Sequence, residues 1–434
     1  MPFPRSRIRV RWWIFICMFL FGTVAYMQRT SLAVATDQIK SELHVSQLQV
    51  FMLLWAFQIA YTALQMPGGA IGQRIGARAA FIVIGVVGFI ATVAMPLAPV
   101  LLSGTALIGA LVLAQAVLGA AQAPVFPVQA GVFEAWFPVS RWGLVNGIGT
   151  TGMDLGTAVT PPLIVALTAS FGWQGALLSI AVPTAVLTAL WAWYGRDTPR
   201  EHPAVTAEEL AELGEVASEK PAPVTLQRFL HLLANRNVAL LAVSYLSMNY
   251  AFFLLTTAPF LYLVQERHLS QVNSGWLAVL PPIGAGAGAW LGGAFADRFT
   301  ARFGPRWGYR LGPLVSLPLA GVLLLLAMHT DDAYLAVAVL TVAFAAVEFT
   351  EGSYWAATMQ VARADTMAAG GVLNTGGNLG GVIYYPIAGY LSGHGAWNAA
   401  FATGTGFAIV AAVLWLLVKA DQRFDPGALT PRRT

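Results

Sequence analysis

The chain has 434 residues, of which 57% are hydrophobic and only 10% are charged. Soluble domains carry roughly 25% charged residues, so the composition excludes an ordinary soluble enzyme, a disordered protein and a nucleic-acid-binding protein. The net charge is +4, but the basic residues form short clusters between long apolar runs, which is typical of membrane topology. The single cysteine, Cys17, excludes a disulfide framework and a cysteine-ligated metal site, and nothing in the sequence indicates a cofactor.

Long apolar segments predict an all-α membrane protein, because a bilayer-spanning helix needs about 20 apolar residues. The twelve predicted segments are 12–36, 48–70, 79–98, 103–136, 142–168, 174–194, 237–263, 272–295, 308–328, 334–360, 366–391 and 397–419. They are too long, and lack the two-residue alternation, for a transmembrane barrel. The first segment follows arginines at 5–11 and could be a cleaved signal peptide, but its length and the eleven later segments favour a first transmembrane helix.

The basic residues predict the orientation. With the N-terminus inside, 21 of the 24 Lys and Arg residues fall in cytoplasmic segments; Lys40 and Arg267 lie outside, and Arg29 lies within a helix. This agrees with the positive-inside rule. We therefore expect an inner-membrane protein with both termini cytoplasmic.

The longest connection, 196–236, is the charged part of the chain. Thr206 and Glu209 have the spacing of a capping box and predict a short helix. The stretch 226–236 is amphipathic and could lie in the membrane interface, or it could belong to a solvated linker.

The two halves of the chain repeat at a constant offset of 224 residues. The matched positions are Gly69/Gly293, Arg74/Arg298, Gly147/Gly371, Thr151/Thr375, Gly152/Gly376, Leu155/Leu379, Gly156/Gly380, Pro162/Pro386 and Trp173/Trp397. Such a repeat predicts two pseudo-symmetric six-helix bundles, 1–195 and 237–434, joined by the linker 196–236, which is the major facilitator arrangement. The matched glycines permit close helix approach.

Two turns carry a related motif, at 69–78 and at 293–298. Both resemble the glycine- and arginine-containing loop signature of the major facilitator superfamily, in which this loop acts as a gate and a conformational latch. The resemblance assigns gating roles to Arg74, Arg78, Asp297 and Arg298. The first copy has Gln73 at the acidic position, which predicts a weaker N-terminal latch.

Further stretches narrow the resemblance: Tyr26–Leu32, Tyr61–Gly69, Gln122–Pro127 with Trp136–Pro138, Tyr354–Trp355, Asn374–Gly381 and Asp197–Pro203. Together they resemble the anion:cation symporter family, whose bacterial members carry sugar acids and other organic carboxylates. The resemblance implies that Arg29 meets the substrate carboxylate. The predicted substrate-binding residues are Arg29, Tyr26, Tyr61, Gln122, Trp355, Asn374 and Asn378.

The chain departs from this family at two positions where acidic residues commonly couple transport to protons. Here they are Gln28 and Gln122, which cannot titrate. Any proton coupling must then use other intramembrane acids, and the candidates are Glu348, Glu351 and Asp154. The two glutamates are three residues apart, so they share a helix face with Trp355. They could equally be static partners of Arg29 or of backbone groups.

The buried polar residues support the same site independently. An arginine within a span costs about 2.5–3.5 kcal/mol, so Arg29 should face a cavity and a partner, either a substrate anion or an acid such as Glu348 or Glu351. Polar stripes recur on three other segments, and in lipid they must face protein or water. These stripes are Gln58, Tyr61 and Gln65; Tyr245, Asn249, Phe252 and Thr256; and Asn374, Asn378 and Tyr385. Each could contact substrate or form an interhelical hydrogen bond.

These observations favour a secondary transporter of organic anions, working as a monomer by alternating access, over a membrane enzyme, a channel or an ATP-driven pump. No midplane cluster of catalytic residues and no phosphate-binding loop is present in the sequence. The expected partners are a small organic anion, protons and the lipid bilayer. Proton symport is the family expectation, and uniport or anion exchange is the alternative.

Overall fold

The computed structural model describes residues 9–213, 224–266, 277 and 279–425, and the described chain is helical and contains no strand. In lipid the backbone must satisfy its own hydrogen bonds, which long apolar helices do. The first half contains α1 (Val10–Leu43), α2 (Gln47–Ile75), α3 (Ala77–Leu101), α4 (Gly104–Gln122), α5 (Val125–Trp136) and α6 (Trp142–Tyr194). The second half contains α9 (Arg236–Gln265), α11 (Leu280–Met328), α12 (Ala333–Glu348), α13 (Glu351–Ala362), α14 (Thr366–Gly393) and α15 (Trp397–Trp415). Between them lie α7 (Ala207–Leu213) and α8 (Leu226–Leu233).

Nine helical stretches of the described chain are long and apolar enough to cross a membrane, and three of them, of 49 to 61 residues, are long enough to cross twice. Two of the long stretches, α6 and α11, reverse direction at Gly172 and Gly304, where φ is 68° and 74°. Glycine adopts this left-handed conformation without a Cβ penalty. The twelve predicted spans are confirmed. Residues 272–276 of the eighth segment, Arg5, Arg7, Lys220 and Arg267 lie outside the described residues.

Two of the predicted spans, 103–136 and 334–360, are each interrupted by a short turn. A turn at Ala123–Pro124 separates α4 from α5, and a turn at Phe349–Thr350 separates α12 from α13. Pro124 has no N–H and cannot continue the hydrogen-bond ladder. Since the repeat offset is 224, the two turns fall at nearly equivalent places in the two halves. The second turn lies directly between Glu348 and Glu351.

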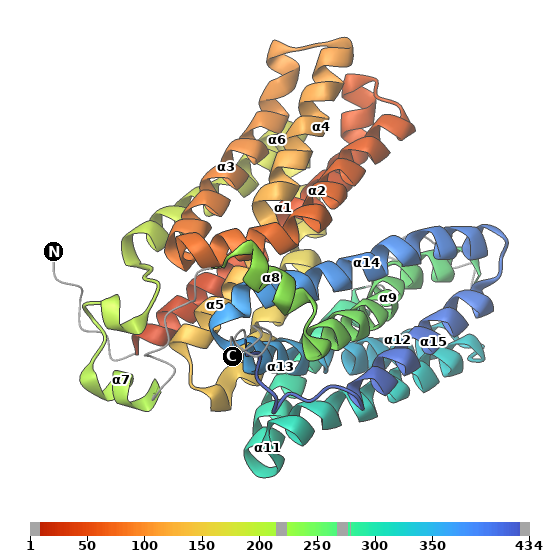
Figure 1. The fold of residues 1–434 in the computed structure, drawn as a ribbon. Coiled ribbons are helices and arrows are strands. Elements are labelled where there is room, and N and C mark those ends of the chain that lie inside the picture. Colours follow the sequence, from red (N-terminus) through yellow and green to blue (C-terminus); the bar gives the residue numbers. More distant parts are fainter. Residues whose placement is uncertain (1–8, 214–223, 267–276, 278, 426–434) are drawn as a thin grey trace.

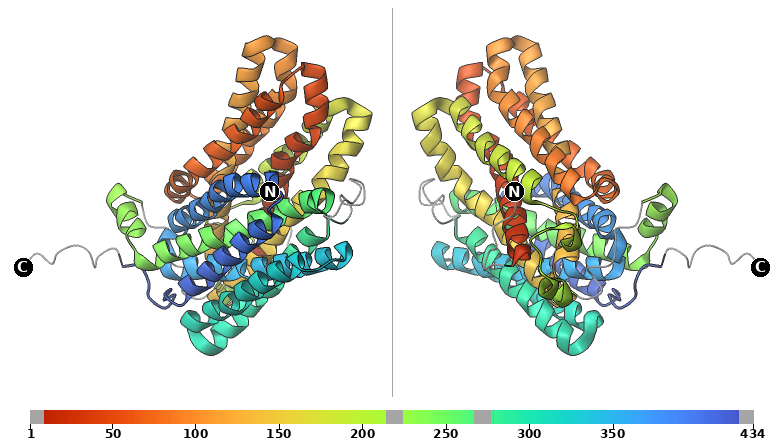
Figure 2. Two further views of the ribbon diagram at one scale, coloured as in Figure 1. Left: turned by 90° about the vertical axis from the view of Figure 1, so that its right-hand side faces the viewer. Right: turned by 90° about the vertical axis from the view of Figure 1, so that its left-hand side faces the viewer.

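The two helical bundles diverge from a common region of contact (Figure 1). The bundle containing α1 to α4 extends upward in this view, and the bundle containing α9, α12, α14 and α15 extends to the right. Seen from the side, the α3–α4 hairpin and α11 lie at opposite outer edges of the molecule (Figure 2). The region of contact lies at the end of the molecule that carries α5, α7, α8 and α13, which we call the closed end.

Two glycine seams join the halves at the closed end. A Cβ at Gly69 of α2 would lie 2.3 Å from the carbonyl oxygen of Met367 at the start of α14, and one at Gly371 would lie 2.7 Å from the carbonyl oxygen of Gln65. A Cβ at Gly147 of α6 would lie 2.2 Å from the carbonyl oxygen of Ala289 in α11. The backbones of the two halves are therefore in direct contact, which only glycine permits.

These seams contain residues that the repeat matched. Gly69 packs against α14, which carries Gly371, and Gly147 packs against α11, which carries Gly293. Each seam thus brings together one glycine from each half. The two seams are equivalent under the repeat, because Gly69 corresponds to Gly293 and Gly147 corresponds to Gly371. Four matched glycines therefore form the contact between the halves, namely Gly69, Gly147, Gly293 and Gly371. The other four, Gly152, Gly156, Gly376 and Gly380, pack against a helix of their own half.

The linker helix α7 docks under the start of α1. Thr206 accepts a hydrogen bond from the backbone N–H of Glu209, at 3.2 Å, so the predicted N-cap forms. The Glu209 carboxylate does not complete the capping box; it accepts hydrogen bonds from the backbone N–H groups of Val10 and Arg11, at 3.2 and 3.0 Å. Glu212 pairs with Arg11. An acidic group at a helix N-terminus is favourable, so α7 caps the first transmembrane helix.

The second linker helix, α8, is amphipathic, as its sequence predicts, and is anchored to the second half; its place in the membrane interface stays a prediction. Leu232 is buried while Leu226 is exposed. Arg228 forms a two-pronged ion pair with Asp365, at 2.7 and 2.8 Å, just before α14. The 196–236 connection is therefore docked on the protein through α7 and α8.

The motif that follows α6 braces the closed end of the first half. Asp197 accepts a hydrogen bond from the backbone N–H of Arg78, at 2.7 Å, at the start of α3. His202 packs edge-on against the rings of Trp136 and Tyr194. Burial among these rings lowers the pKa of the His202 imidazole, which keeps the ring neutral.

Candidate functional site

A cavity of about 240 Å³ lies between the two halves, on the open side of the glycine seams. From the first half it is lined by Tyr26, Arg29, Thr30, Tyr61, Phe126, Thr150, Met153, Asp154 and Thr157. From the second half it is lined by Tyr245, Asn249, Phe252, Phe253, Thr256, Pro282, Phe344, Glu348, Glu351, Trp355, Asn374, Asn378 and Tyr385. The lining combines aromatic rings with a few convergent polar groups, as small-molecule sites do.

Arg29 projects from α1 into a cage of aromatic rings. Its guanidinium carbon lies 5.5, 5.3 and 5.1 Å from the ring centres of Tyr26, Phe57 and Tyr61. Such contacts stabilise a cation by about 0.5–2 kcal/mol. One terminal nitrogen donates a hydrogen bond to the Gln58 side-chain oxygen, at 2.7 Å. Within the described chain Arg29 forms no ion pair, so the alternative of a static salt bridge to Glu348 or Glu351 is not observed.

Gln58 connects this cage to the second half. Its side-chain nitrogen donates to Asn378, at 3.2 Å, and to Thr62, at 3.1 Å. A neutral amide fixes the direction of the arginine without neutralising its charge. The Arg29 cation therefore remains available to an anion in the cavity.

The two glutamates differ in their surroundings. Glu351 accepts hydrogen bonds on both oxygens, from the Tyr245 hydroxyl and the Trp355 indole, each at 2.9 Å. Glu348 is only 1% exposed, and neither of its oxygens has a hydrogen-bond partner. Two donors stabilise an ionised carboxylate at Glu351, whereas an ionised and unpartnered carboxylate at Glu348 would be very costly. Glu348 is therefore better suited to the neutral, protonated form.

Asp154 reaches the same cavity from α6. One of its oxygens is buried and has no hydrogen-bond partner. The three predicted coupling residues are therefore brought together around one space, although their role in coupling stays a prediction.

Gln122 is the one predicted substrate-binding residue that the structure does not bring to the cavity. Its side-chain nitrogen donates to the Gln28 side chain, at 3.0 Å, and to the carbonyl oxygen of Ala25, at 3.2 Å. Gln28 in turn donates to Thr92 and Thr184, at 2.8 and 3.0 Å. These hydrogen bonds join α1, α3, α4 and α6, so the amide network is internal to the first half. It satisfies buried polar groups there and does not face the cavity.

The predicted gating residues separate into two groups. Asp297 accepts hydrogen bonds from the backbone N–H groups of Gly143 and Leu144, at 2.7 and 2.8 Å, so it joins α11 to the N-terminus of α6 across the halves. Arg78 donates to the carbonyl oxygen of Ala192, at 2.6 Å, within the first half. Arg74 and Arg298 are exposed and form no ion pair within the described chain.

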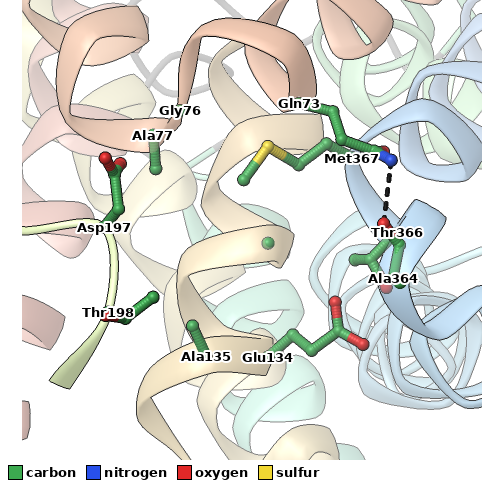
Figure 3. Close-up of a pocket in the computed structure, with 11 residues that line it drawn as sticks. Gln73, Gly76, Ala77, Glu134, Ala135, Asp197, Thr198, Ala364, Thr366 and Met367 are labelled. Carbon is green, nitrogen blue, oxygen red and sulfur yellow. Dashed lines mark hydrogen bonds between the residues drawn. The ribbon is translucent and has the colours of Figure 1, made fainter. Parts of the chain in front are cut away.

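Gln73 makes the equivalent connection in the other direction (Figure 3). Its nitrogen donates to the carbonyl oxygen of Ala364, at 2.8 Å, and its oxygen accepts from the backbone N–H of Ala368, at 3.1 Å. Since 73 and 368 correspond to 297 and 144 under the repeat, the two contacts are pseudo-symmetric. The amide also donates to the Asp365 carboxylate, at 3.3 Å, so it forms hydrogen bonds across the halves at the position where the superfamily signature has an acidic side chain.

Several lining residues were not predicted from the sequence. Thr150 and Thr157 are two of them; with the predicted Asp154 they fall at positions i, i+4 and i+7 of one helix, a polar stripe that could have identified this face of α6. Met153, Phe253, Pro282 and Phe344 gave no signal, because apolar side chains are expected everywhere in a membrane span.

A cavity of this kind between two repeated six-helix bundles defines a membrane transporter. The Major Facilitator Superfamily model matches residues 14–369 and 256–434, so the chain belongs to that superfamily. It is a multi-pass membrane protein and a secondary transporter of the major facilitator type, not an enzyme.

Curated relatives are named as organic-anion transporters. The chain is 29% identical to the probable sulfoacetate transporter SauU of Cupriavidus necator, over 89% of this chain and 88% of the relative. It is 28% identical to the probable galactarate/D-glucarate transporter GarP of Escherichia coli, over 96% of both chains, and 26% identical to GudP of Bacillus subtilis, of the same description, over 95% and 92%. The resemblance to a bacterial organic-anion family is confirmed.

Solved structures share the fold. The proton:xylose symporter XylE matches with a TM-score of 0.77 at 13% identity, over 97% of this chain and 99% of that chain. The Escherichia coli fucose:proton symporter FucP matches with a TM-score of 0.70 at 12% identity, over 95% and 100%.

Proposed function

We propose that this transporter carries a small organic anion, such as a sugar acid, across the bacterial inner membrane in symport with protons. The observation that carries the proposal is Arg29, which faces the cavity between the halves and is fixed by a neutral amide and aromatic rings. An intramembrane cation held in this way suits an anionic ligand. The relatives named as sulfoacetate and galactarate/D-glucarate transporters support an organic anion as the substrate.

Proton coupling is assigned to Glu348, with Glu351 and Asp154 in the same cavity. The unpartnered Glu348 favours a bound proton. An anion entering the cavity favours the neutral form further, because like charges repel in a poorly hydrated space. Anion binding and proton binding would thus reinforce each other.

The transport cycle is assigned to alternating access between the bundles 1–195 and 237–434. With both termini and the 196–236 linker in the cytoplasm, the closed end is cytoplasmic and the cavity opens outward. The inward-open state then requires separation of the two glycine seams and of the Gln73 and Asp297 contacts. Such short contacts between the halves are either fully formed or broken, which suits a switch between a closed and an open cytoplasmic end.

The proposal is tested by transport in proteoliposomes with a panel of organic acids, with and without a pH gradient. We expect gradient-driven accumulation by the natural protein. Glu348→Gln and Glu351→Gln should abolish that accumulation and retain substrate exchange, while Glu208→Gln, on an exposed face of α7, should behave as the natural protein. Full accumulation by both cavity variants would remove the glutamates from coupling and leave Asp154.

A uniporter or an anion exchanger is the second candidate, favoured by the Gln28–Gln122 network. Amides occupy both positions where the family commonly has titratable acids, and their hydrogen bonds are satisfied within the protein. If the natural protein exchanges anions but does not respond to a pH gradient, symport is excluded and this second candidate takes its place.

A further inference from the structure

The charges around the central cavity are unequal. Arg29, from α1, is the one cation among the lining residues that the structure describes. Three carboxyl groups line the same space: Asp154 from α6, Glu348 from α12 and Glu351 from α13. An anionic ligand therefore meets one fixed positive charge and several acidic groups.

Arg29 can bind one acidic group of the ligand. Its orientation is set by Gln58 and by the surrounding rings, and a planar guanidinium binds one carboxylate or sulfonate through two parallel hydrogen bonds. Within the described lining there is no second cation that could pair with another anionic group of the same ligand.

The Glu351 carboxylate opposes a second negative charge on the ligand. Both oxygens of Glu351 already accept hydrogen bonds from Tyr245 and Trp355, which favours the ionised form. A ligand carboxylate beside it would be a buried charge without a partner, next to a like charge. A ligand hydroxyl has no such penalty, since it donates to a carboxylate oxygen and accepts from an amide.

The remaining polar groups suit hydroxyls. The Asn374 side chain is only 7% exposed, lines the cavity and places its amide beside the Tyr61 hydroxyl. Asn249, Asn378 and Thr256 add amide and hydroxyl groups around it. An uncharged polyol can satisfy such a mixture of donors and acceptors.

We infer that the transported substrate is a hydroxylated monoanion, with one acidic group at Arg29 and an uncharged, hydroxyl-rich remainder toward the second half, and that dianions are rejected. The inference rests on the proposed function and specifies its substrate class. It distinguishes this chain from the relatives named as galactarate or sulfoacetate transporters, because galactarate and sulfoacetate each carry two acidic groups.

The test is equilibrium binding to the purified full-length protein at pH 7 with matched acids. D-galactonate and galactarate, and likewise gluconate and glucarate, differ only in whether the terminal carbon is a hydroxymethyl or a carboxylate group. We expect at least about tenfold tighter binding of the monoanion in each pair that binds, because a buried unpaired charge is strongly unfavourable. Equal or tighter binding of the dianion would overturn the inference, and so would preferential binding of a zwitterionic amino acid.

A variant identifies the cause of the discrimination. Glu351→Gln removes one negative charge at nearly constant shape and should narrow the preference for the monoanion, whereas Glu208→Gln should not. An unchanged preference in the first variant would remove Glu351 as the selective group and contradict the argument.

The two proposals fail differently. If all four acids fail to bind but another organic anion binds and loses affinity in Arg29→Gln, the monoanion inference is wrong and the proposed function stands. If no organic anion binds in a manner that depends on Arg29, the proposed function itself is wrong.

Discussion

Arg29 shows how a charge can be buried in a membrane protein and still be available. Its hydrogen-bond partner, Gln58, is neutral, and three aromatic rings surround the guanidinium. The rings and the amide offset part of the cost of desolvation, and a ligand anion supplies the rest. A carboxylate in place of Gln58 would compete with the substrate for the same donors.

We expect Arg29→Lys to reduce anion affinity at least about tenfold, because it keeps the charge but loses the bidentate fork, and a charge-assisted hydrogen bond is worth about 1.5–3 kcal/mol. Arg29→Ala should bind more weakly still. The measurement is equilibrium binding of an acid that the natural protein carries. Arg302→Lys, on an exposed turn of α11, is the control. Undiminished binding by both Arg29 variants would make the arginine structural.

Gln122 provides the opposite case, a polar residue whose hydrogen bonds are all internal to the first half. Replacing it with leucine leaves the Gln28 oxygen and the Ala25 carbonyl without that donor. We expect Gln122→Leu to lower the free energy of unfolding by about 1–3 kcal/mol, the cost of unsatisfied buried groups, with little change in affinity. Thermal unfolding and binding on the same sample measure this. A loss of affinity at unchanged stability would place Gln122 in contact with substrate after all.

At the scale of helices, the glycine seams determine how closely the halves approach. Gly69 and Gly147 lie against backbone carbonyl groups of the opposite half, closer than any Cβ permits. The seams are therefore stabilising only in the closed arrangement. Small residues spaced along a helix give this close contact, but their spacing does not indicate which neighbour they face.

We expect Gly147→Ala to open the closed end, since the added Cβ would lie 2.2 Å from the Ala289 carbonyl oxygen. The reporter is a single cysteine at position 367, in the other seam, in a Cys17→Ser background. Its labelling by a membrane-permeant maleimide should become at least about tenfold faster, because overpacking costs about 1–3 kcal/mol. Gly109→Ala is the matched control, since no atom lies within 4 Å of its Cβ position. Equal labelling in the two variants would show that the seam tolerates the methyl group.

Across the whole molecule, the linker connects the closed end to both bundles. Its first helix caps α1 through Glu209, and its second helix pairs with Asp365 through Arg228. Asp365 also accepts a hydrogen bond from Gln73, at 3.3 Å, so the ion pair supports the contact between the halves. The linker thus contributes to the closed arrangement in addition to joining the two repeats.

The positive-inside distribution predicts that this linker is cytoplasmic. A cysteine at Glu208, in the Cys17→Ser background, should not react with a membrane-impermeant maleimide in intact cells and should react after lysis. A cysteine at Ser103, an exposed position between α3 and α4, should react from outside. Labelling of position 208 in intact cells would reverse the orientation and make the cavity face inward.

The sequence determined the features that depend on local hydropathy and on repetition. Length and apolarity are sufficient to predict the twelve spans. Periodicity is sufficient to predict the polar stripes of α2, α9 and α14, and most residues of these stripes line the cavity. Resemblance identified the family from motifs such as Tyr26–Leu32. Hydropathy, periodicity and short motifs depend only on residues close together in the sequence, so they can be read without knowing how the two halves pack together.

Only the tertiary structure decided how residues far apart in the chain are paired. It placed Gln122 in an internal network, gave Gln73 a partner 295 residues away, and left Glu348 without partners while Glu351 gained two. It also showed that the two glutamates are separated by a turn in the backbone. The physical reason is that hydrogen bonds and close backbone contacts depend on how the two bundles dock, and neither composition nor local spacing contains that geometry.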